Sequence, residues 1–316
     1  MNKARIMTVV RVAVSVALIV WILRKAPLGE VLDAFRSADF RFVLLALALS
    51  PLGYWSSVSR WRLLIRSQGG DAPFGFLVRS FLVGVFFNNL LPSTIGGDAV
   101  RAYDTARSGV GRAAALAIVV VDRFIGLLAL MLFAGVGLLL SGHLTDRVPA
   151  LYGWVAGGTA VMGLIAALLF LPSRRAPDLL ARLGPHFKKV SDAIFAFQGK
   201  GAVLAKAFGY SLVLQTLVVL NGWLLAKALH VPIPLPYFFL IVPLAVFVMM
   251  IPVSINAIGV RESIWAFFFA AFGVASAKGV AVAWLDYGLV LLQALIGGGI
   301  YASSHRAPEI AEEAVS

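Results

Sequence analysis

Long runs of hydrophobic residues recur along the chain, and their length is the strongest structural signal in the sequence. An α-helix rises about 1.5 Å per residue, so roughly 18 or more apolar residues in a row can cross the hydrocarbon core of a bilayer. Six runs reach this length and predict membrane-spanning helices: residues 6–23, 42–59, 113–140, 150–171, 203–227 and 280–301.

Two further apolar stretches, residues 74–91 and 238–251, are shorter, and each ends at a proline, Pro92 or Pro252. Proline removes a backbone donor and clashes with the preceding helical turn, so both stretches are predicted to end there. A small, polar segment follows each proline. We therefore expect two broken or re-entrant helical hairpins, with positive-φ backbone at their tips supplied by glycines: Gly96, Gly97 and Gly259.

The segments that follow the two prolines resemble each other. Arg101 follows Pro92 by nine residues, and Arg261 follows Pro252 by the same number. Each arginine is preceded by a valine. This agreement indicates a duplicated unit.

The correspondence extends to one intramembrane carboxylate in each half. Asp122 lies thirteen residues after Gly109, and Asp286 lies thirteen residues after Gly273, both within apolar runs. Internal repeats of opposite orientation are common in transporters, which place their substrate sites between the repeats. The sequence therefore predicts one integral membrane domain, residues 1–316, that contains an inverted repeat of two motif units, residues 74–141 and 236–302.

Composition supports a membrane protein and excludes several other classes. Apolar residues make up 60% of the chain and charged residues 13%, against roughly 45–50% and 25% in soluble domains. A chain this apolar is neither a water-soluble globule nor a disordered polymer. It has no cysteine and only four scattered histidines, so we expect no disulfide framework, no metal site and no cofactor.

The excess of basic residues is explained by topology rather than by nucleic-acid binding. The net charge is +12, from 27 Lys and Arg against 15 Asp and Glu. With six spans, two re-entrant hairpins and both termini in the cytoplasm, most basic residues, Arg60 among them, fall on the cytoplasmic side, as the positive-inside rule requires. Arg123 and Arg261 are left at membrane depth. The basic segment 173–200 is predicted to be a cytoplasmic loop, either an amphipathic helix on an anionic leaflet or a solvated linker.

Charged side chains within the bilayer need partners, because burial there costs about 2.5–3.5 kcal/mol per charge on insertion scales. A guanidinium can bind a lipid phosphate through two hydrogen bonds. It can equally pair with a carboxylate of its own unit. For Arg101 that carboxylate would be Asp98 or Asp122, and for Arg261 it would be Glu262 or Asp286. From the sequence, contact with a substrate and pairing with a carboxylate of the same unit are both open for Arg101 and Arg261.

Other polar residues of the apolar runs are expected to form interhelical hydrogen bonds or to line a cavity: Asn88, Asn89, Gln215, Asn221 and Gln293. The tryptophans lie mostly near the ends of the predicted spans and are interpreted as interfacial anchors: Trp21, Trp55, Trp61, Trp154, Trp223 and Trp265.

Three motifs resemble those of a known family. They are Leu-Pro-Ser-Thr-Ile-Gly-Gly-Asp-Ala-Val-Arg at residues 91–101, Val-Val-Asp-Arg at 120–123 and Gly-Val-Arg-Glu at 259–262. They are similar to the signatures of the flippase-like family that includes the transmembrane domain of lysylphosphatidylglycerol synthases. One difference is Asn256-Ala257, where that family usually has a glycine pair. The soluble aminoacyl-transferase domain of the synthases has no counterpart in this chain, so we expect no lysine transfer.

The resemblance implies a multi-pass protein of the cytoplasmic (inner) membrane that moves or binds an anionic phospholipid or a polyprenyl-linked glycolipid. Its partners would be membrane lipids, with no nucleic acid and no catalytic residue. The residues expected to contact the substrate combine the motif positions with their polar neighbours: Pro92, Ser93, Thr94, Gly96, Gly97, Asp98, Arg101, Asp122, Arg123, Pro252, Ser254, Asn256, Gly259, Arg261, Glu262 and Asp286.

Two alternatives belong to other functional classes. A glycosyltransferase that uses a polyprenyl phosphate would need paired acidic residues near the outer surface. Asp33 and Asp39 are isolated on what the sequence predicts to be a short loop there, which disfavours this alternative. The other alternative is a non-catalytic membrane partner of a soluble or membrane-bound lipid-modifying enzyme, with segment 173–200 as its docking surface.

Overall fold

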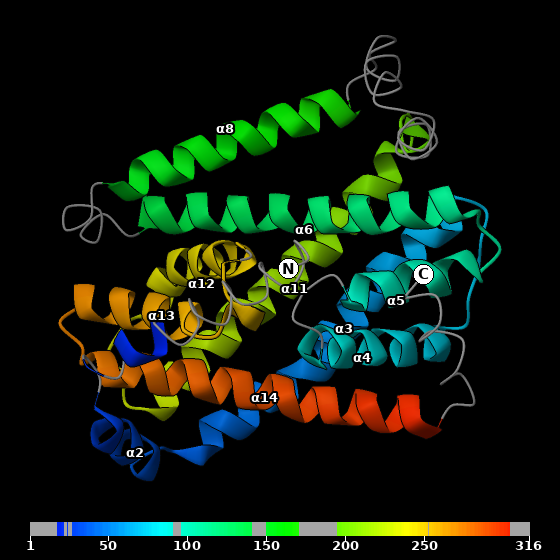
Figure 1. Ribbon diagram of the computed structural model, residues 1–316. Helices are drawn as coiled ribbons and strands as arrows, with labels where there is room; N and C mark the ends of the chain where they lie inside the picture. Colours follow the sequence, from blue (N-terminus) through cyan, green and yellow to red (C-terminus); the bar gives the residue numbers. More distant parts are fainter. Residues whose placement is uncertain are drawn as a thin grey trace, which may run out of the picture.

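The architecture is all-helical throughout the part of the chain that the computed structural model describes, namely residues 18–21, 24, 27–90, 96–140, 150–170, 195–251 and 253–303. Four of these helices are long and apolar enough to cross a membrane: α3 (Phe40–Ser67), α6 (Arg112–Leu140), α11 (Gly201–Ala228) and α14 (Ser276–Ser303). The prediction of an integral membrane protein is thereby confirmed. A further helix, α8 (Ala150–Phe170), packs along α6 (Figure 1).

The remaining two predictions of long segments fall mainly outside the described residues. Of the first predicted span, 6–23, only residues 18–21 are described. The basic segment 173–200 is described from residue 195 onward. At the end of that segment, the buried Phe197 packs into the core beside α3, and the Lys200 ammonium donates a hydrogen bond to the carbonyl of Ser67. Lys200 therefore places a positive charge at the C-terminus of α3, where the helix dipole favours it.

Both predicted helix breaks are present, and each separates two short helices. The first pair is α4 (Phe74–Leu90) and α5 (Gly96–Ala106), and the second is α12 (Leu235–Met250) and α13 (Val260–Ala271), with a short 3₁₀ turn (Ile255–Ala257) between the latter two. Figure 1 shows the two pairs at opposite ends of the long helices. Residues 91–95 and 252, which hold both prolines, lie outside the described part.

Each short pair packs against a long helix of the other half. Helix α4 lies against α14, and α12 lies against α6, while α3 and α11 form an extensive contact between the halves. This exchange of partners is what a two-fold relation between units 74–141 and 236–302 would produce. The repeat itself and the number of spans stay predictions.

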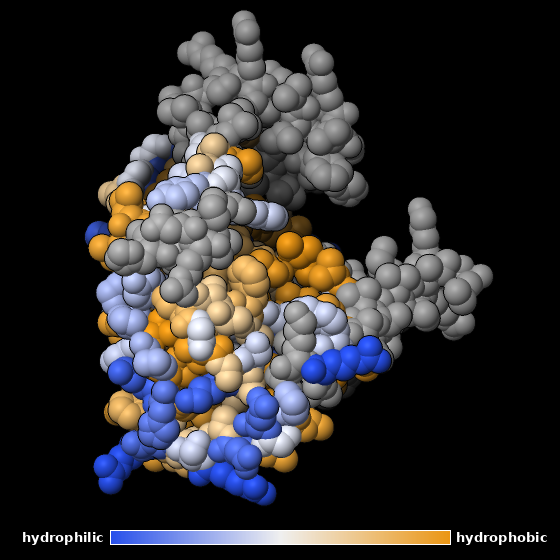
Figure 2. All heavy atoms as spheres, turned by 90° about the vertical axis from the view of Figure 1, so that its left-hand side faces the viewer, coloured by the Kyte–Doolittle hydropathy of each residue, from blue (hydrophilic) through white to orange (hydrophobic). Residues whose placement is uncertain are grey.

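The predicted loop around Asp33 is wrong, because this segment is helix α2 (Leu28–Arg36). Val31 and Ala34 are buried against the core formed mainly by α11, α12, α13 and α14. On the exposed side Asp33 pairs with Arg36 at 3.1 Å. Figure 2 shows this end of the molecule, with hydrophilic side chains over its lower part, where α2 lies, next to broad hydrophobic areas. Apolar residues spaced three apart let α2 cover the end of the bundle.

Two glycines permit the closest helix contacts between the halves. A Cβ added to Gly297 of α14 would collide with the carbonyl oxygen of Leu82 on α4. A Cβ added to Gly137 of α6 would collide with the backbone of Phe239 and Leu240 on α12. Small residues allow such backbone approach in membranes, where van der Waals packing drives association.

The substitution Gly297→Ala is therefore expected to destabilise the protein by about 1–3 kcal/mol, the usual cost of overpacking. Gly299→Ala is the matched control, because a Cβ at Gly299 meets no atom within 4 Å and alanine favours the helix. Thermal unfolding in detergent should show a lower Tm for Gly297→Ala than for Gly299→Ala. Equal Tm values would show that the α4–α14 contact tolerates a wider spacing.

The predicted role of the glycines at the helix breaks is right for one of them. Gly259 has a φ of 82° and precedes α13. Gly96 and Gly97, in contrast, are the first residues of α5. Gly97 is required by close packing instead, since its Cβ would collide with the carbonyl of Gly84 on α4. The prediction of positive φ is wrong for Gly97, because this residue already lies within helix α5.

Two further residues of the second break also have positive φ, namely Asn256 (φ 49°) and Ala257 (φ 57°). Asparagine tolerates the left-handed region, whereas alanine is strained there by roughly 1–2 kcal/mol. A glycine pair at positions 256 and 257, as expected from the family with similar motifs, would not have this strain.

Candidate functional site

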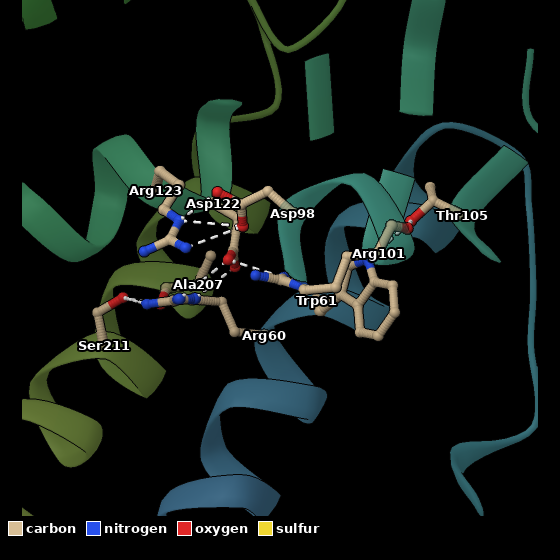
Figure 3. A network of polar contacts seen from close by, with 9 residues as sticks. All are labelled: Arg60, Trp61, Asp98, Arg101, Thr105, Asp122, Arg123, Ala207 and Ser211. Atoms are coloured by element: carbon tan, nitrogen blue, oxygen red, sulfur yellow. Dashed lines mark hydrogen bonds and ion pairs between the residues drawn. The ribbon is translucent and has the colours of Figure 1, made fainter. Parts of the chain in front are cut away.

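A buried carboxylate on α6 joins two arginines from other helices. Asp122 accepts hydrogen bonds at 2.6 and 3.1 Å from Nε and Nη2 of Arg60, which lies on α3. It also accepts one at 2.9 Å from Nη2 of Arg101, which lies on α5. All three residues are buried, and Figure 3 shows the carboxylate between the two guanidinium groups. For Arg101, the structure therefore selects Asp122 rather than Asp98 as the internal partner.

Arg60 was not among the site residues predicted from the sequence, which counts it with the basic residues on the cytoplasmic side of the membrane; in the structure its side chain is buried among the helices. Helix α3 continues about two turns past residue 59, the end of the apolar run, and carries Arg60 into the interior. There the Nη1 atom of Arg60 donates to Ser211 Oγ on α11 at 2.6 Å. The i, i+4 spacing of the buried Ser56 and Arg60 on α3 was the available signal, because it places both residues on one helix face.

Arg101 also rests on an aromatic ring. Its guanidinium carbon lies 4.7 Å from the ring centroid of Trp61. The indole N–H of Trp61 donates to Thr105 Oγ1 at 2.9 Å, and the Thr105 hydroxyl donates to the Arg101 carbonyl at 2.7 Å. Trp61 is fully buried, so its predicted role as an interfacial anchor is wrong, and the same holds for Trp265. These contacts fix the orientation of Arg101.

A second ion pair joins the start of α5 to α6. Arg123 donates to both carboxylate oxygens of Asp98 at 2.9 to 3.2 Å. This pair is more accessible than the first, with side chains 46% and 24% exposed. At the same helix start, the backbone N–H of Gly97 donates to Asn88 Oδ1 of α4 at 2.7 Å. The short helix α5 is thereby held against α4 and α6.

These groups surround a cavity of about 330 Å³. Its charged lining consists of three guanidiniums and two carboxylates, and the rest of the wall is mainly apolar side chains of α4, α6, α11 and α12: Phe81, Val85, Leu127, Leu130, Leu214, Val246 and Met250. The formal charge of the lining is therefore +1. The Arg101 Nε is buried and has no hydrogen-bond partner among the described atoms. An anion is the ligand that this cavity fits.

The second unit is built differently at the corresponding positions. The guanidinium carbon of Arg261 lies 4.4 Å from the ring centroid of Tyr287. Within the described residues no carboxylate oxygen lies within 4.0 Å of Arg261, so neither predicted ion pair with Glu262 or Asp286 forms. Asp286 instead accepts a hydrogen bond at 3.1 Å from the amide of Asn221 on α11.

The other candidate residues of the second unit hold the helix break together. The Glu262 carboxylate accepts from the Gly259 N–H at 2.7 Å and so caps α13. The Asn256 amide donates to Asn89 Oδ1 at 2.9 Å and to Tyr287 Oη at 3.0 Å. Ser254 is buried, with no partner for its hydroxyl among the described atoms.

Asp286 lines a second cavity of about 290 Å³, together with Asn221 and Gln293. The two cavities share three wall residues, Ser57, Phe81 and Leu214. Gln293 donates to Ser50 Oγ of α3 at 2.8 Å. The prediction that the amide side chains form interhelical bonds or line a cavity is confirmed for Asn88, Asn89, Gln215, Asn221 and Gln293.

The predicted site residues thus divide into three groups, apart from Gly96, which is buried at the start of α5 and lines neither cavity. Gly97, Asp98, Arg101, Asp122 and Arg123 line the first cavity. Asp286 lines the second cavity, and the remaining described residues of the second unit lie at the helix break near it. Pro92, Ser93, Thr94 and Pro252 lie outside the described residues.

Comparison with known proteins agrees with this architecture. The family model of the lysylphosphatidylglycerol synthase TM region matches residues 8–297. A UPF0104 membrane protein of Pyrococcus horikoshii is 22% identical over 323 aligned positions, which cover 93% of this chain and 96% of that relative. A UPF0104 membrane protein of Methanothermobacter thermautotrophicus is 37% identical over 124 residues, covering 39% of this chain and 36% of the relative.

Proposed function

The chain belongs to the family of the lysylphosphatidylglycerol synthase transmembrane region, and from that premise we propose that it is a lipid transporter of the flippase type. Its substrate would be an anionic phospholipid or a polyprenyl-linked glycolipid, moved across the cytoplasmic membrane without covalent chemistry. In this proposal both chain termini lie in the cytoplasm, and the partners of the protein are the lipids of the bilayer.

The observation that carries the proposal is the charge of the first cavity. A cavity that only needed internal ion pairing would hold equal numbers of acidic and basic groups, whereas this one holds three arginines and two aspartates. A lipid phosphodiester carries one negative charge and accepts hydrogen bonds from a guanidinium in a planar, bidentate geometry. Binding it would neutralise the cavity.

Arg101 is the residue best placed to receive the phosphate. It gives Asp122 a single hydrogen bond through Nη2, while its Nε has no partner among the described atoms. Arg60 holds the same carboxylate through two hydrogen bonds. A phosphate can therefore take Arg101 away from Asp122 without leaving that carboxylate unpaired. When the phosphate leaves, Arg101 returns to Asp122.

The shared wall of the two cavities supports movement of a headgroup between them. Ser57, Phe81 and Leu214 border both the space beside Asp122 and the space beside Asp286. The two cavities, one with Asp122 and the other with Asp286 in its wall, are therefore neighbours in the interior of an apolar bundle. In membrane proteins, such intramembrane polar groups mark substrate pathways by default.

Headgroup translocation in proteoliposomes tests the proposal. Arg101→Gln should slow the translocation of a fluorescent anionic phospholipid by about tenfold or more, since a hydrogen bond to a charged group is worth roughly 1.5–3 kcal/mol. Arg79→Gln is the matched control, because it removes the same charge from an exposed position of α4 outside the cavity. Equal rates for the wild type and Arg101→Gln, with both proteins folded, would contradict the proposal.

A further inference from the structure

The carboxylates that line the two cavities differ in their partners. In the first cavity, Asp122 pairs with two arginines and Asp98 pairs with a third. In the second cavity, Asp286 accepts a hydrogen bond at 3.1 Å from the Asn221 amide. Within the described part of the chain, no guanidinium or ammonium nitrogen lies within 4.0 Å of the Asp286 carboxylate. No ion pair of the described residues therefore compensates a negative charge on Asp286.

Asp286 also lies deep in the span that α14 forms. It is ten residues from the first residue of this helix, which corresponds to about 15 Å. An ionised carboxylate at such a depth needs a cationic partner, because an isolated charge in apolar surroundings is costly. A protonated carboxyl group carries no charge and needs only hydrogen bonds. The contacts of Asp286 therefore fit a protonated group. Much of the cavity wall around it is apolar: Leu49, Leu214, Leu217, Val218, Leu289 and Val290.

The cation that interacts electrostatically with Asp286 is Arg261, the second residue of α13. Helix α13 packs along the first part of α14 (Figure 1). The Arg261 guanidinium nevertheless lies on the ring of Tyr287, 4.4 Å from its centroid. Its Nε atom is buried without a hydrogen-bond partner among the described atoms. Arg261 is therefore close enough to be attracted by an ionised Asp286, and in this conformation it does not pair with it.

Other titratable groups near α14 do not replace Arg261 in this role. The second cavity also contains Tyr54 of α3, whose buried hydroxyl has no partner among the described atoms. Glu262 caps its own helix, and Asp33 pairs with Arg36 on the exposed side of α2. The other described ionisable residues on the helices around Asp286 lie outside the cavity lining: Glu30 on α2, Arg41, Arg60, Arg62 and Arg66 on α3, Arg79 on α4, Lys206, Tyr210 and Lys227 on α11, and Lys278 and Tyr301 on α14.

The site suits a proton better than a metal cation. The Asn221 amide directs an N–H toward Asp286, whereas a hard metal cation requires several oxygen ligands directed at it. A proton needs one carboxylate oxygen and access to water. The second cavity, of about 290 Å³, has room for several water molecules at about 30 Å³ each. Polar side chains of its wall can hydrogen-bond them: Ser50, Tyr54, Ser57 and Gln293.

We propose that Asp286 is a proton-binding site whose carboxyl group alternates between two partners, a proton and Arg261. In this conformation the carboxyl group carries the proton, and Arg261 rests on Tyr287. When the proton leaves to water in the second cavity, the carboxylate attracts the guanidinium and with it the start of α13. This inference rests on the proposed function for its purpose, since a proton taken up and released at Asp286 would couple lipid movement to a proton gradient.

Carbodiimide labelling tests the proton site without transport. Dicyclohexylcarbodiimide enters apolar regions and modifies protonated carboxyl groups, and mass spectrometry of the protein from proteoliposomes locates the adduct. We expect Asp286 to be labelled with a yield that falls as the pH rises. The exposed Asp33 of α2 is the internal control and should stay unlabelled in the same digest. Labelling of Asp286 that is absent at every pH, or that does not depend on pH, would overturn the inference.

The exchange between the proton and Arg261 is tested on the same reaction. Arg261→Gln removes the cation that compensates the ionised carboxylate, so labelling of Asp286 should persist to a pH about one unit higher. Arg261→Lys keeps the positive charge and should leave the midpoint near that of the wild type, which separates the effect of charge from a folding defect. An identical midpoint in Arg261→Gln and the wild type would show that the two groups do not exchange.

Proteoliposomes with an imposed pH gradient test the coupling. In the wild type, a gradient of one pH unit should change the ratio of a fluorescent anionic phospholipid between the leaflets by up to about tenfold if one proton moves per lipid. Asp286→Asn cannot exchange a proton and should abolish this response, whereas the matched control Asp33→Asn should keep it. A response that Asp286→Asn retains would contradict the proposal. A sodium gradient at constant pH with the same effect would overturn the assignment to a proton.

The two readouts separate this inference from the proposed function. Labelling of Asp286 that depends on pH and on Arg261, in a wild type that moves no lipid, would contradict the transporter proposal and leave the proton site standing. Lipid translocation that ignores the pH gradient, in a protein whose Asp286 is never labelled, would contradict the proton site and leave the transporter proposal standing.

Discussion

The substitution Asp122→Asn should destabilise the protein by about 3–5 kcal/mol, the usual consequence of removing one partner from a buried ion pair. Asp122 is fully buried and is the carboxylate that both Arg60 and Arg101 contact. An amide can still accept one hydrogen bond, but it leaves two positive charges within the apolar interior without compensation. Unfolding by denaturant in detergent micelles measures the loss.

Asp286→Asn is the matched control in the other unit. The described hydrogen bond of Asp286 comes from the Asn221 amide, and no guanidinium lies within salt-bridge distance among the described residues. Its replacement should therefore cost only about 1 kcal/mol, the typical net value of a hydrogen bond. Adding Arg101→Gln to Asp122→Asn should restore part of the lost stability, because it removes one uncompensated charge. If Asp122→Asn lowers the free energy of unfolding no more than Asp286→Asn does, the buried ion pairs of Asp122 do not stabilise the fold.

Trp61→Ala is expected to cost about 3–5 kcal/mol, as large-to-small substitutions of buried tryptophans usually do. Trp61 is fully buried on α3 and supports the Arg101 guanidinium through its ring. Its loss should therefore lower both the Tm and the affinity of the cavity for an anionic lipid. Thermal unfolding and equilibrium lipid binding, measured on the same preparation, separate the two effects.

Two further variants locate the cause of the Trp61 effect. Trp61→Phe keeps a ring beneath Arg101 but removes the N–H that Thr105 accepts, so it should fall between the wild type and alanine. Trp154→Ala removes a tryptophan that is 73% exposed on α8 and should change the Tm very little. If Trp61→Ala and Trp154→Ala have the same Tm, the stability of the protein does not depend on the buried Trp61 ring.

Most of the helices could be predicted from the sequence because the bilayer imposes a strict length on apolar runs. The predicted runs 113–140 and 203–227 correspond to α6 and α11 within two residues at either end. Arg101 and Asp122 were also recognisable, because an ionisable residue inside or beside an apolar run is rare and has to be compensated. Local rules of hydrophobicity and proline placement suffice for such features.

The composition of the site could not be predicted in full. Arg60 follows an apolar run, and by sequence alone it is equivalent to Arg62 and Arg66. In the structure Arg62 and Arg66 pair with Asp71 near the surface, while Arg60 faces Asp122. Only the angular position of each residue on α3 distinguishes them, and that matters only once α6 and α11 are packed beside it.

The sequence by itself determined that this chain spans a membrane, where its two helix breaks fall and which charged residues lie among apolar ones, because each of these depends on residues close together in the chain. The tertiary structure decided that Arg60 joins Arg101 at Asp122, that Arg261 lies on Tyr287 instead of on a carboxylate, and that the first cavity has a positive charge. Those outcomes depend on which helix faces which. Arg101 and Asp122 are 21 residues apart in the chain and Arg60 and Asp122 are 62 apart, and such partners on different helices meet only through packing.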